Sequence, residues 1–148
     1  MDPTTARQEA PNETARDEST ASSKTLALAA LEAALDKKGL APVLIDLSGQ
    51  SSYTDFILVL SGRSDRHVQH IADGIEQTLG TELGRRAIGA EGMTDGRWVL
   101  IDYGEVVIHV FYHPLRDFYD LEGLWCDAPR VELQIPEDAR VVTDDVTF

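Results

Sequence analysis

One short run of residues constrains the fold more than any other part of the chain. Phe56 to Leu60 reads FILVL, a continuous apolar run with the length of a strand. Successive side chains of a strand point to opposite faces of a sheet, so a strand that is apolar throughout is covered on both faces. We therefore expect this run to form a central strand of a sheet that has helices packed on it.

The other elements are placed by their periodicity and by their start and stop signals. A first helix is expected over residues 24–38, with Ser22 or Ser23 as N-cap and Gly39 as the stop. A second helix begins after the N-cap Ser64 and ends at Gly80 or Gly84. The remaining strands are expected at 43–47, 86–90, 98–102 and 106–112, followed by a short closing helix at 116–125. This order, α-β-β-α-β-β-β-α, predicts an α/β (α+β) fold with a mixed sheet of about five strands.

The composition divides the chain into three parts. Residues 1–23 are rich in Thr, Ser, Ala and Glu and have no large apolar residue after Met1, so we expect a disordered acidic tail. Residues 24–128 contain the expected helices and strands and form the predicted domain. Residues 129–148 combine two prolines with an acidic cluster, and we expect an extended acidic tail that lies against the domain.

The charge of the chain restricts its partners. The 148 residues carry a net charge of −13, which opposes direct binding to a nucleic-acid backbone. The same charge suits a basic protein partner, although acidity can also serve solubility alone. Cys126 is the single cysteine and cannot form an internal disulfide. With no secretory signal and no apolar run of about 20 residues, the expected location is the cytoplasm, away from membranes.

No complete catalytic site is visible in the sequence. Nucleotidyl transfer needs two neighbouring carboxylates that hold metal ions, but the same-face neighbours of Asp102 are Leu100 and Gly104. The segment 62–64 precedes a helix without the glycine-rich pattern and lysine of a phosphate-binding loop. Cys126 has no obvious base near it in sequence, so it is interpreted as a bystander. We therefore expect a protein that binds a partner, without enzymatic activity and without a cofactor.

Four histidines offer a weak metal signal. His67 and His70 share a helix face, and His109 and His113 lie on or near the last strand. His67 and His70 together with one histidine of the last strand would supply three ligands for a metal ion. Because no cysteine pair supports it and histidines at helix starts are commonly solvated, no metal is predicted.

The strand over residues 98–102 carries the clearest candidate surface. Its side chains alternate between two faces, with Trp98, Leu100 and Asp102 on one and Val99, Ile101 and Tyr103 on the other. A carboxylate is costly to bury unpaired, so the face with Asp102 is expected to be the outer one. Antiparallel pairing would bring Glu105 or His109 near it. A tryptophan rimmed by acids is typical of a contact for a basic protein, although a solvated sheet face or a tryptophan packed under a loop would show the same pattern.

Three long motifs resemble one family. They are SSYTDFILVLSGRSDRHVQHIADGI (Ser51 to Ile75), EGMTDGRWVLIDYGEVVIHVF (Glu91 to Phe111) and RDFYDLEGLW (Arg116 to Trp125). In order and spacing they resemble the ribosomal silencing factors, also called the RsfS or Iojap family. The resemblance extends over about Thr25 to Ala128 and leaves out both tails.

The resemblance implies a fold, a partner and a mode of action. Its members are shaped like nucleotidyltransferases without the catalytic acids, and they are often homodimers when free. They bind large-subunit ribosomal protein fourteen and block the joining of the subunits, which represses translation when nutrients are scarce. A large-subunit assembly factor, or a nucleotidyltransferase-type enzyme, is the alternative.

The resemblance also implies binding residues. The matching positions of the family interface are Trp98, Asp102, Tyr103, Glu105 and His109. Arg66 and His67 match a helix start of the family, where they either contact a partner or brace the loop.

Overall fold

The expected central strand lies in the middle of the sheet. The computed structural model of the chain describes residues 11–140, with side chains from Ser22 onward. The run from Phe56 to Leu60 falls within β2 (Phe56–Gly62), and every residue of β2 is buried. β2 pairs in parallel with β5 (Val106–Tyr112) and antiparallel with β1 (Leu40–Asp46). Its central position is therefore confirmed.

The sheet is mixed and has six strands in the order β3-β4-β5-β2-β1-β6. The further elements are α2 (Pro11–Asp36), α3 (Asp65–Leu83), β3 (Gly89–Glu91), β4 (Trp98–Asp102), α4 (His113–Tyr119), the 3-10 helix η1 (Leu121–Trp125), β6 (Arg130–Val131) and α5 (Glu137–Arg140). The predicted α/β class is confirmed, and β6 adds one strand to the expected five. No helix within residues 11–140 is both long enough and apolar enough to cross a membrane.

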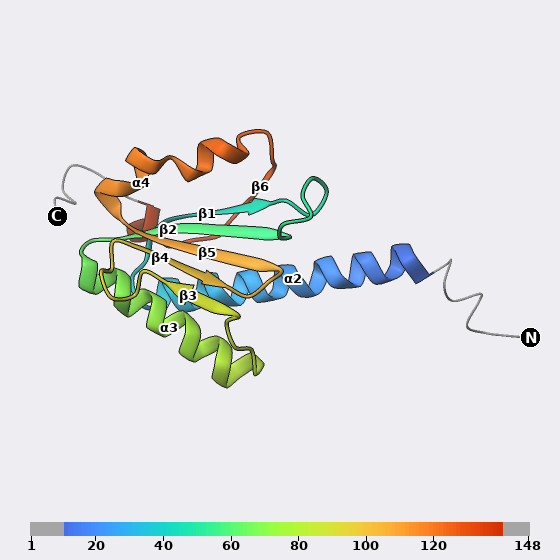
Figure 1. Cartoon of the computed structure of the whole chain (residues 1–148), viewed down its shortest axis with the longest axis horizontal. Helices are drawn as coiled ribbons and strands as arrows, with labels where there is room; N and C mark the ends of the chain where they lie inside the picture. Colours follow the sequence, from blue (N-terminus) through green and yellow to red (C-terminus); the bar gives the residue numbers. More distant parts are fainter. Residues whose placement is uncertain (1–10, 141–148) are drawn as a thin grey trace, which may run out of the picture.

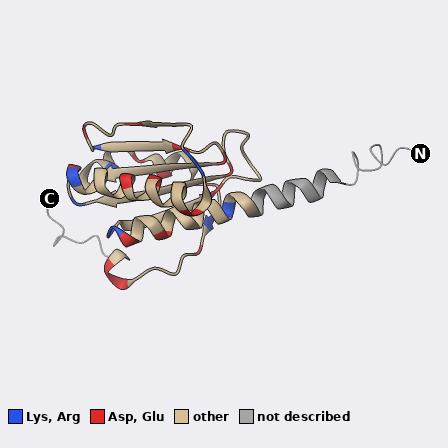
Figure 2. Ribbon diagram, turned by 90° about the horizontal axis from the view of Figure 1, so that it is seen from below, with Lys and Arg blue, Asp and Glu red and all other residues tan. Residues whose placement is uncertain are grey.

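The two faces of the sheet are covered unequally. The helices α2 and α3 lie side by side on one face and enclose the larger core with Leu58, Leu60 and Ile108 (Figures 1 and 2). On the other face, α4 and η1 cover a smaller core that contains Ile57, Val59 and Phe111 (Figure 1). Alternate residues of β2 thus point into different cores, which explains why the strand is apolar throughout.

The start and the end of α3 agree with the signals in the sequence. Ser64 is the N-cap, and its hydroxyl accepts a hydrogen bond of 3.0 Å from the backbone N–H of His67. Gly84 ends the helix in the left-handed conformation with φ of +65°, which glycine adopts without steric cost. The buried face consists of Val68, Ile71, Ala72, Gly74, Ile75 and Leu79.

The first helix begins earlier than predicted. α2 starts at Pro11, so the expected N-cap at Ser22 or Ser23 is wrong, and residues 11–23 form the first part of this helix. Alanine, glutamate and arginine in this segment favour helix, and a helix already anchored by packing extends without a new nucleation step. Ser23 is 1% exposed, and its hydroxyl donates to the Asp55 carboxylate over 2.6 Å. Residues 1–10 lie outside the described residues.

Other boundaries also differ. β1 begins at Leu40, and the strand expected at 86–90 is shortened to β3. The closing helix starts at His113 with a proline in its first turn, where a missing N–H costs nothing. It breaks at Asp120, whose φ is +46°, and η1 continues from there. The segment expected to lie extended against the domain from residue 129 contributes β6, which pairs with β1, and then α5; residues 141–148 are outside the described part.

Candidate protein-binding site

The outer face of β4 is the candidate site. Trp98, Leu100 and Asp102 are half-buried on this face, away from α2 and α3. The residues that alternate with them are buried in the larger core: Val99, Ile101 and Tyr103. The predicted orientation of the strand is therefore confirmed, with the carboxylate at the surface and the aliphatic side chains inside.

Trp98 is held in place by three neighbours on two elements, β5 and α4. Its indole Nε1–H donates a hydrogen bond of 3.0 Å to Nδ1 of His109 on β5. The indole stacks on Phe111 with ring centroids 4.8 Å apart, and Tyr119 of α4 lies at the same centroid distance. A side chain whose orientation is fixed before binding loses less entropy when a partner arrives.

His109 lies beneath Trp98 and is 4% exposed. Burial lowers the pKa of His109 to about 4, so its imidazole is neutral at physiological pH. Since Nδ1 accepts the indole hydrogen bond, the ring proton resides on Nε2. His109 thus positions Trp98 and does not itself reach a partner.

This buried imidazole makes stability depend on pH. The pKa of His109 is about 4 in the folded protein against the ordinary 6.5, so the unfolded chain takes up the proton first as the pH falls. The effect is absent above pH 6.5 and grows as the pH drops towards 4. We expect His109 to account for a loss of about 2–3 kcal/mol of unfolding free energy between pH 7 and pH 4.5.

The measurement is urea unfolding at both pH values for the natural protein and for His109→Gln. The glutamine amide oxygen can still accept the indole hydrogen bond but does not titrate. The lowered pKa values of His113 and Glu105 affect both proteins and cancel in the comparison. An equal pH-dependent loss in the two proteins would contradict the role given to His109.

Asp102 has a structural role and also carries a half-buried charge. Its Oδ1 accepts a hydrogen bond of 2.7 Å from the backbone N–H of Gly104, which fixes the turn between β4 and β5. Gly104 has φ of +92°, a conformation that disfavours other residues. The pKa of the nearby Tyr53 is raised by burial and then by the Asp102 carboxylate. Asp102 therefore adds negative charge to the end of β4 opposite Trp98.

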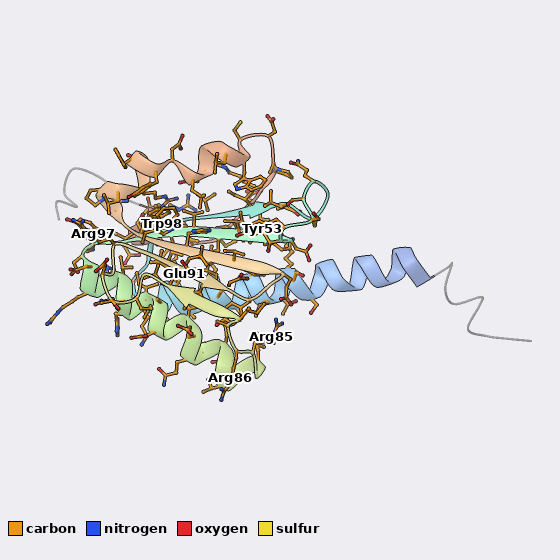
Figure 3. All side chains as sticks on the ribbon, in the orientation of Figure 1. Tyr53, Arg85, Arg86, Glu91, Arg97 and Trp98 are labelled. Carbon is orange, nitrogen blue, oxygen red and sulfur yellow. The ribbon has the colours of Figure 1, made fainter. Side chains whose placement is uncertain are left out.

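Two predicted residues near this turn differ from their expected roles. Tyr103 is 2% exposed and burial raises its pKa to about 12, so its side chain belongs to the core and lies away from the outer face. Its alternation with Val99 and Ile101 already indicated this orientation. Glu105 accepts two hydrogen bonds of 2.9 Å from Arg85, which lower the pKa of this carboxyl. Figure 3 shows Arg85 at the far end of the sheet from Trp98.

His67 braces the start of α3. Its Nδ1 accepts the backbone N–H of Arg63 over 2.9 Å, and its Nε2 donates to the carbonyl of Lys37 over 2.8 Å. The imidazole thereby links the end of α2 to the start of α3. Of the two roles that the sequence left open for His67, contact with a partner and bracing of the loop, this geometry favours bracing. The neighbouring Arg66 is exposed, and its backbone N–H donates to Asp65.

Two exposed aromatic residues of α4 were not predicted to take part. Phe118 is 78% exposed and Tyr119 is 48% exposed. Their rings are 5.1 Å apart in an edge-on arrangement, and Tyr119 in turn contacts Trp98. We call these three residues the aromatic surface. The adjacency of Phe118 and Tyr119 in the sequence was no signal of exposure, because consecutive residues of a helix can both be buried, as Ile71 and Ala72 are in α3.

A buried arginine fixes the helix that carries this surface. Arg116 is 6% exposed, and its Nη1 donates to the carbonyl of Ala41 over 2.7 Å and to the hydroxyl of Ser61 over 2.9 Å. Its Nε donates to Glu122 over 2.9 Å. α4 is thus attached to β1, to β2 and to η1 through one guanidinium group.

The histidines do not assemble into a metal site. Three of them have other neighbours: His67 contacts Lys37, His109 contacts Trp98, and Nδ1 of His113 lies 2.9 Å from the Ser61 hydroxyl. Within the described part of the chain, no three His, Cys, Asp or Glu side chains gather closely enough to hold a metal ion.

Comparison with known proteins places these features in a family context. The family model described as "Ribosomal silencing factor during starvation" matches residues 20–146. The chain is 42% identical over 113 residues to "Ribosomal silencing factor RsfS" of Halalkalibacterium halodurans, covering 76% of this chain and 96% of that protein. It is 39% identical over 110 residues to the protein of the same name from Bacillus subtilis, covering 74% and 92%.

A solved structure and a more distant relative extend the comparison. A crystal structure of a protein from Chromobacterium violaceum matches with a TM-score of 0.67 and 34% identity, covering 76% of this chain and 92% of that one. The mouse protein "Mitochondrial assembly of ribosomal large subunit protein 1" is 29% identical over 85 residues, which cover 55% of this chain and 37% of that protein.

Proposed function

The chain belongs to the RsfS family of ribosomal silencing factors, and from this premise we propose that it acts on the large ribosomal subunit. In this proposal it binds large-subunit ribosomal protein fourteen, occupies space that the small subunit needs, and so represses translation under nutrient limitation. The protein acts in the cytoplasm and forms a homodimer when free of the ribosome. The mechanism is occlusion, with no catalytic step and no cofactor.

One observation carries the proposal beyond family membership. The outer face of β4 presents Trp98 and Asp102 half-exposed, with the indole already oriented by His109. Tryptophan is enriched among residues that dominate binding energy, and oriented side chains bind at lower entropic cost. Together with a net charge of −13, this face suits a basic protein. We propose Trp98, Asp102 and the supporting His109 as the centre of the contact, with Glu105 at its margin.

Arg66 remains a proposed peripheral contact, because it is exposed at the start of α3. His67 and Tyr103 are proposed to act only through the fold, since one joins two helices and the other is in the core.

Sedimentation with purified subunits tests the proposal. We expect the full-length protein to travel with large subunits and not with small ones at low salt. Preincubation of large subunits with the protein should reduce the yield of joined ribosomes when small subunits are added. Because exposed charge pairs are screened, the association should weaken as salt rises from about 0.05 to 0.5 M. Unchanged joining despite saturated large subunits would refute occlusion.

A second candidate is an assembly role, which the name of the mouse relative favours. An assembly factor would bind immature large subunits and leave the joining of mature subunits unchanged. The joining experiment separates the two, because both roles predict binding and only silencing predicts a block.

A further inference from the structure

We propose that α4 forms a second part of the docking surface for the same basic large-subunit protein, with Phe118 and Tyr119 as its apolar contacts and Asp117 and Asp120 as its charged ones. The inference rests on the proposed function and adds a region outside β4 and the β4–β5 turn.

Exposure of the aromatic residues is the first argument. Phe118 leaves 78% of its surface in water, and the adjacent Tyr119 leaves 48%. Burial of a phenylalanine side chain is strongly favourable, so a ring as exposed as that of Phe118 forgoes a sizeable gain in stability. Contiguous apolar surface of this kind marks sites of protein contact.

Charge identifies the partner class. Asp117 and Asp120, which flank Phe118 and Tyr119, are exposed, and Asp127 is exposed beyond η1. The only cation of α4, Arg116, is buried and already paired with Glu122, so it does not offset these acids. Apolar rings rimmed by uncompensated carboxylates complement a protein segment that carries lysine or arginine beside apolar residues. The same carboxylates repel a ribosomal RNA backbone.

Continuity with the β4 face is the third argument. Tyr119 contacts Trp98 with ring centroids 4.8 Å apart, so the aromatic surface runs unbroken from the sheet onto α4. Figure 3 shows Trp98 on the side of the sheet where α4 lies. Arg116 fixes α4 to β1 and β2 through buried hydrogen bonds, so the two parts are presented to a partner as one rigid unit.

The first test compares two apolar deletions in the full chain by titration of the labelled protein with purified large subunits. Phe118→Ser is expected to raise the Kd at least tenfold. Leu83→Ser is the matched control, because Leu83 is 42% exposed at the end of α3, on the opposite side of the sheet. The Kd of Leu83→Ser for large subunits should stay within twofold of the Kd of the natural protein.

The second test compares two charge reversals that alter the net charge equally. Asp117→Lys should raise the Kd at least tenfold, whereas Glu82→Lys on the exposed side of α3 should have an effect of less than about threefold. Equal weakening by both variants would mean that long-range charge alone acts, and it would overturn the local contact.

The outcomes separate this inference from the proposed function. If the natural protein fails to bind large subunits, the proposed function is wrong and the inference falls with it. If it binds and Phe118→Ser binds equally well, only the inference is overturned. The aromatic surface could instead bind a second copy of this chain, and sedimentation equilibrium of the free proteins tests this. If Phe118→Ser becomes monomeric but keeps its Kd for large subunits, α4 serves self-association and the inference is overturned.

Discussion

Replacement of Arg116 by methionine is expected to lower the free energy of unfolding by about 3–5 kcal/mol, because it breaks a buried ion pair from one side. The guanidinium donates to Ala41, Ser61 and Glu122, and its own side chain is only 7% exposed. Methionine matches much of the arginine stem but has no donor, so a buried carbonyl and a largely buried carboxylate are left unsatisfied. Urea denaturation at pH 7 measures the loss.

Arg85→Met is the matched control for this prediction. Arg85 also binds a glutamate over 2.9 Å, but its side chain is 36% exposed and that of Glu105 is 29% exposed. Solvent screens such a pair, and we expect a change below about 1 kcal/mol. A similar loss of unfolding free energy in the two arginine variants would show that burial does not make the Arg116 ion pair more important than the exposed one.

Replacement of Trp98 by alanine is expected to weaken binding to large subunits at least ~30-fold, which corresponds to about 2 kcal/mol. The variant loses the largest side chain of the aromatic surface and leaves Nδ1 of buried His109 without its donor. Trp98→Phe keeps the ring contacts with Phe111 and Tyr119 but lacks the indole N–H, and an intermediate Kd is expected. Titration with purified large subunits measures all three proteins.

Loss of stability must be separated from loss of contact in this experiment. Val99→Ala provides the control, because Val99 is fully buried on the opposite face of β4 and its truncation costs stability without altering the outer face. Circular dichroism establishes that each variant is folded under the binding conditions. The proposed contact would be contradicted if Val99→Ala weakened binding as much as Trp98→Ala, or if Trp98→Ala bound like the natural protein.

The fold could be predicted wherever a periodic pattern coincided with an explicit start or stop signal. The run in β2, the alternation in β4 and the cap at Ser64 each predicted an element that the structure contains. The start of α2 could not be predicted in this way. Its first turns carry no apolar stripe, and their helical state depends on local propensity and on continuity with the packed part of the helix. β6 was missed because two residues are too few to show alternation.

The candidate site was predictable at the level of strand faces but not of pairwise contacts. Alternation placed Trp98 and Asp102 outside, yet only the register of β4 against β5 brings the indole to His109. Arg116 is a charged residue within a short helix, and nothing in the sequence indicated that it would be buried. Two of its three acceptors, Ala41 and Ser61, lie far from it in the chain, so its burial follows from tertiary structure.

Both margins of the sheet end in very short strands. β3 has three residues and β6 has two, so neither presents a long row of free N–H and C=O groups to another molecule. Through such rows the sheets of different molecules can pair edge to edge and aggregate, and a short edge strand is one means by which natural proteins prevent it. A protein whose sheet ends in such short strands should remain dispersed at high concentration.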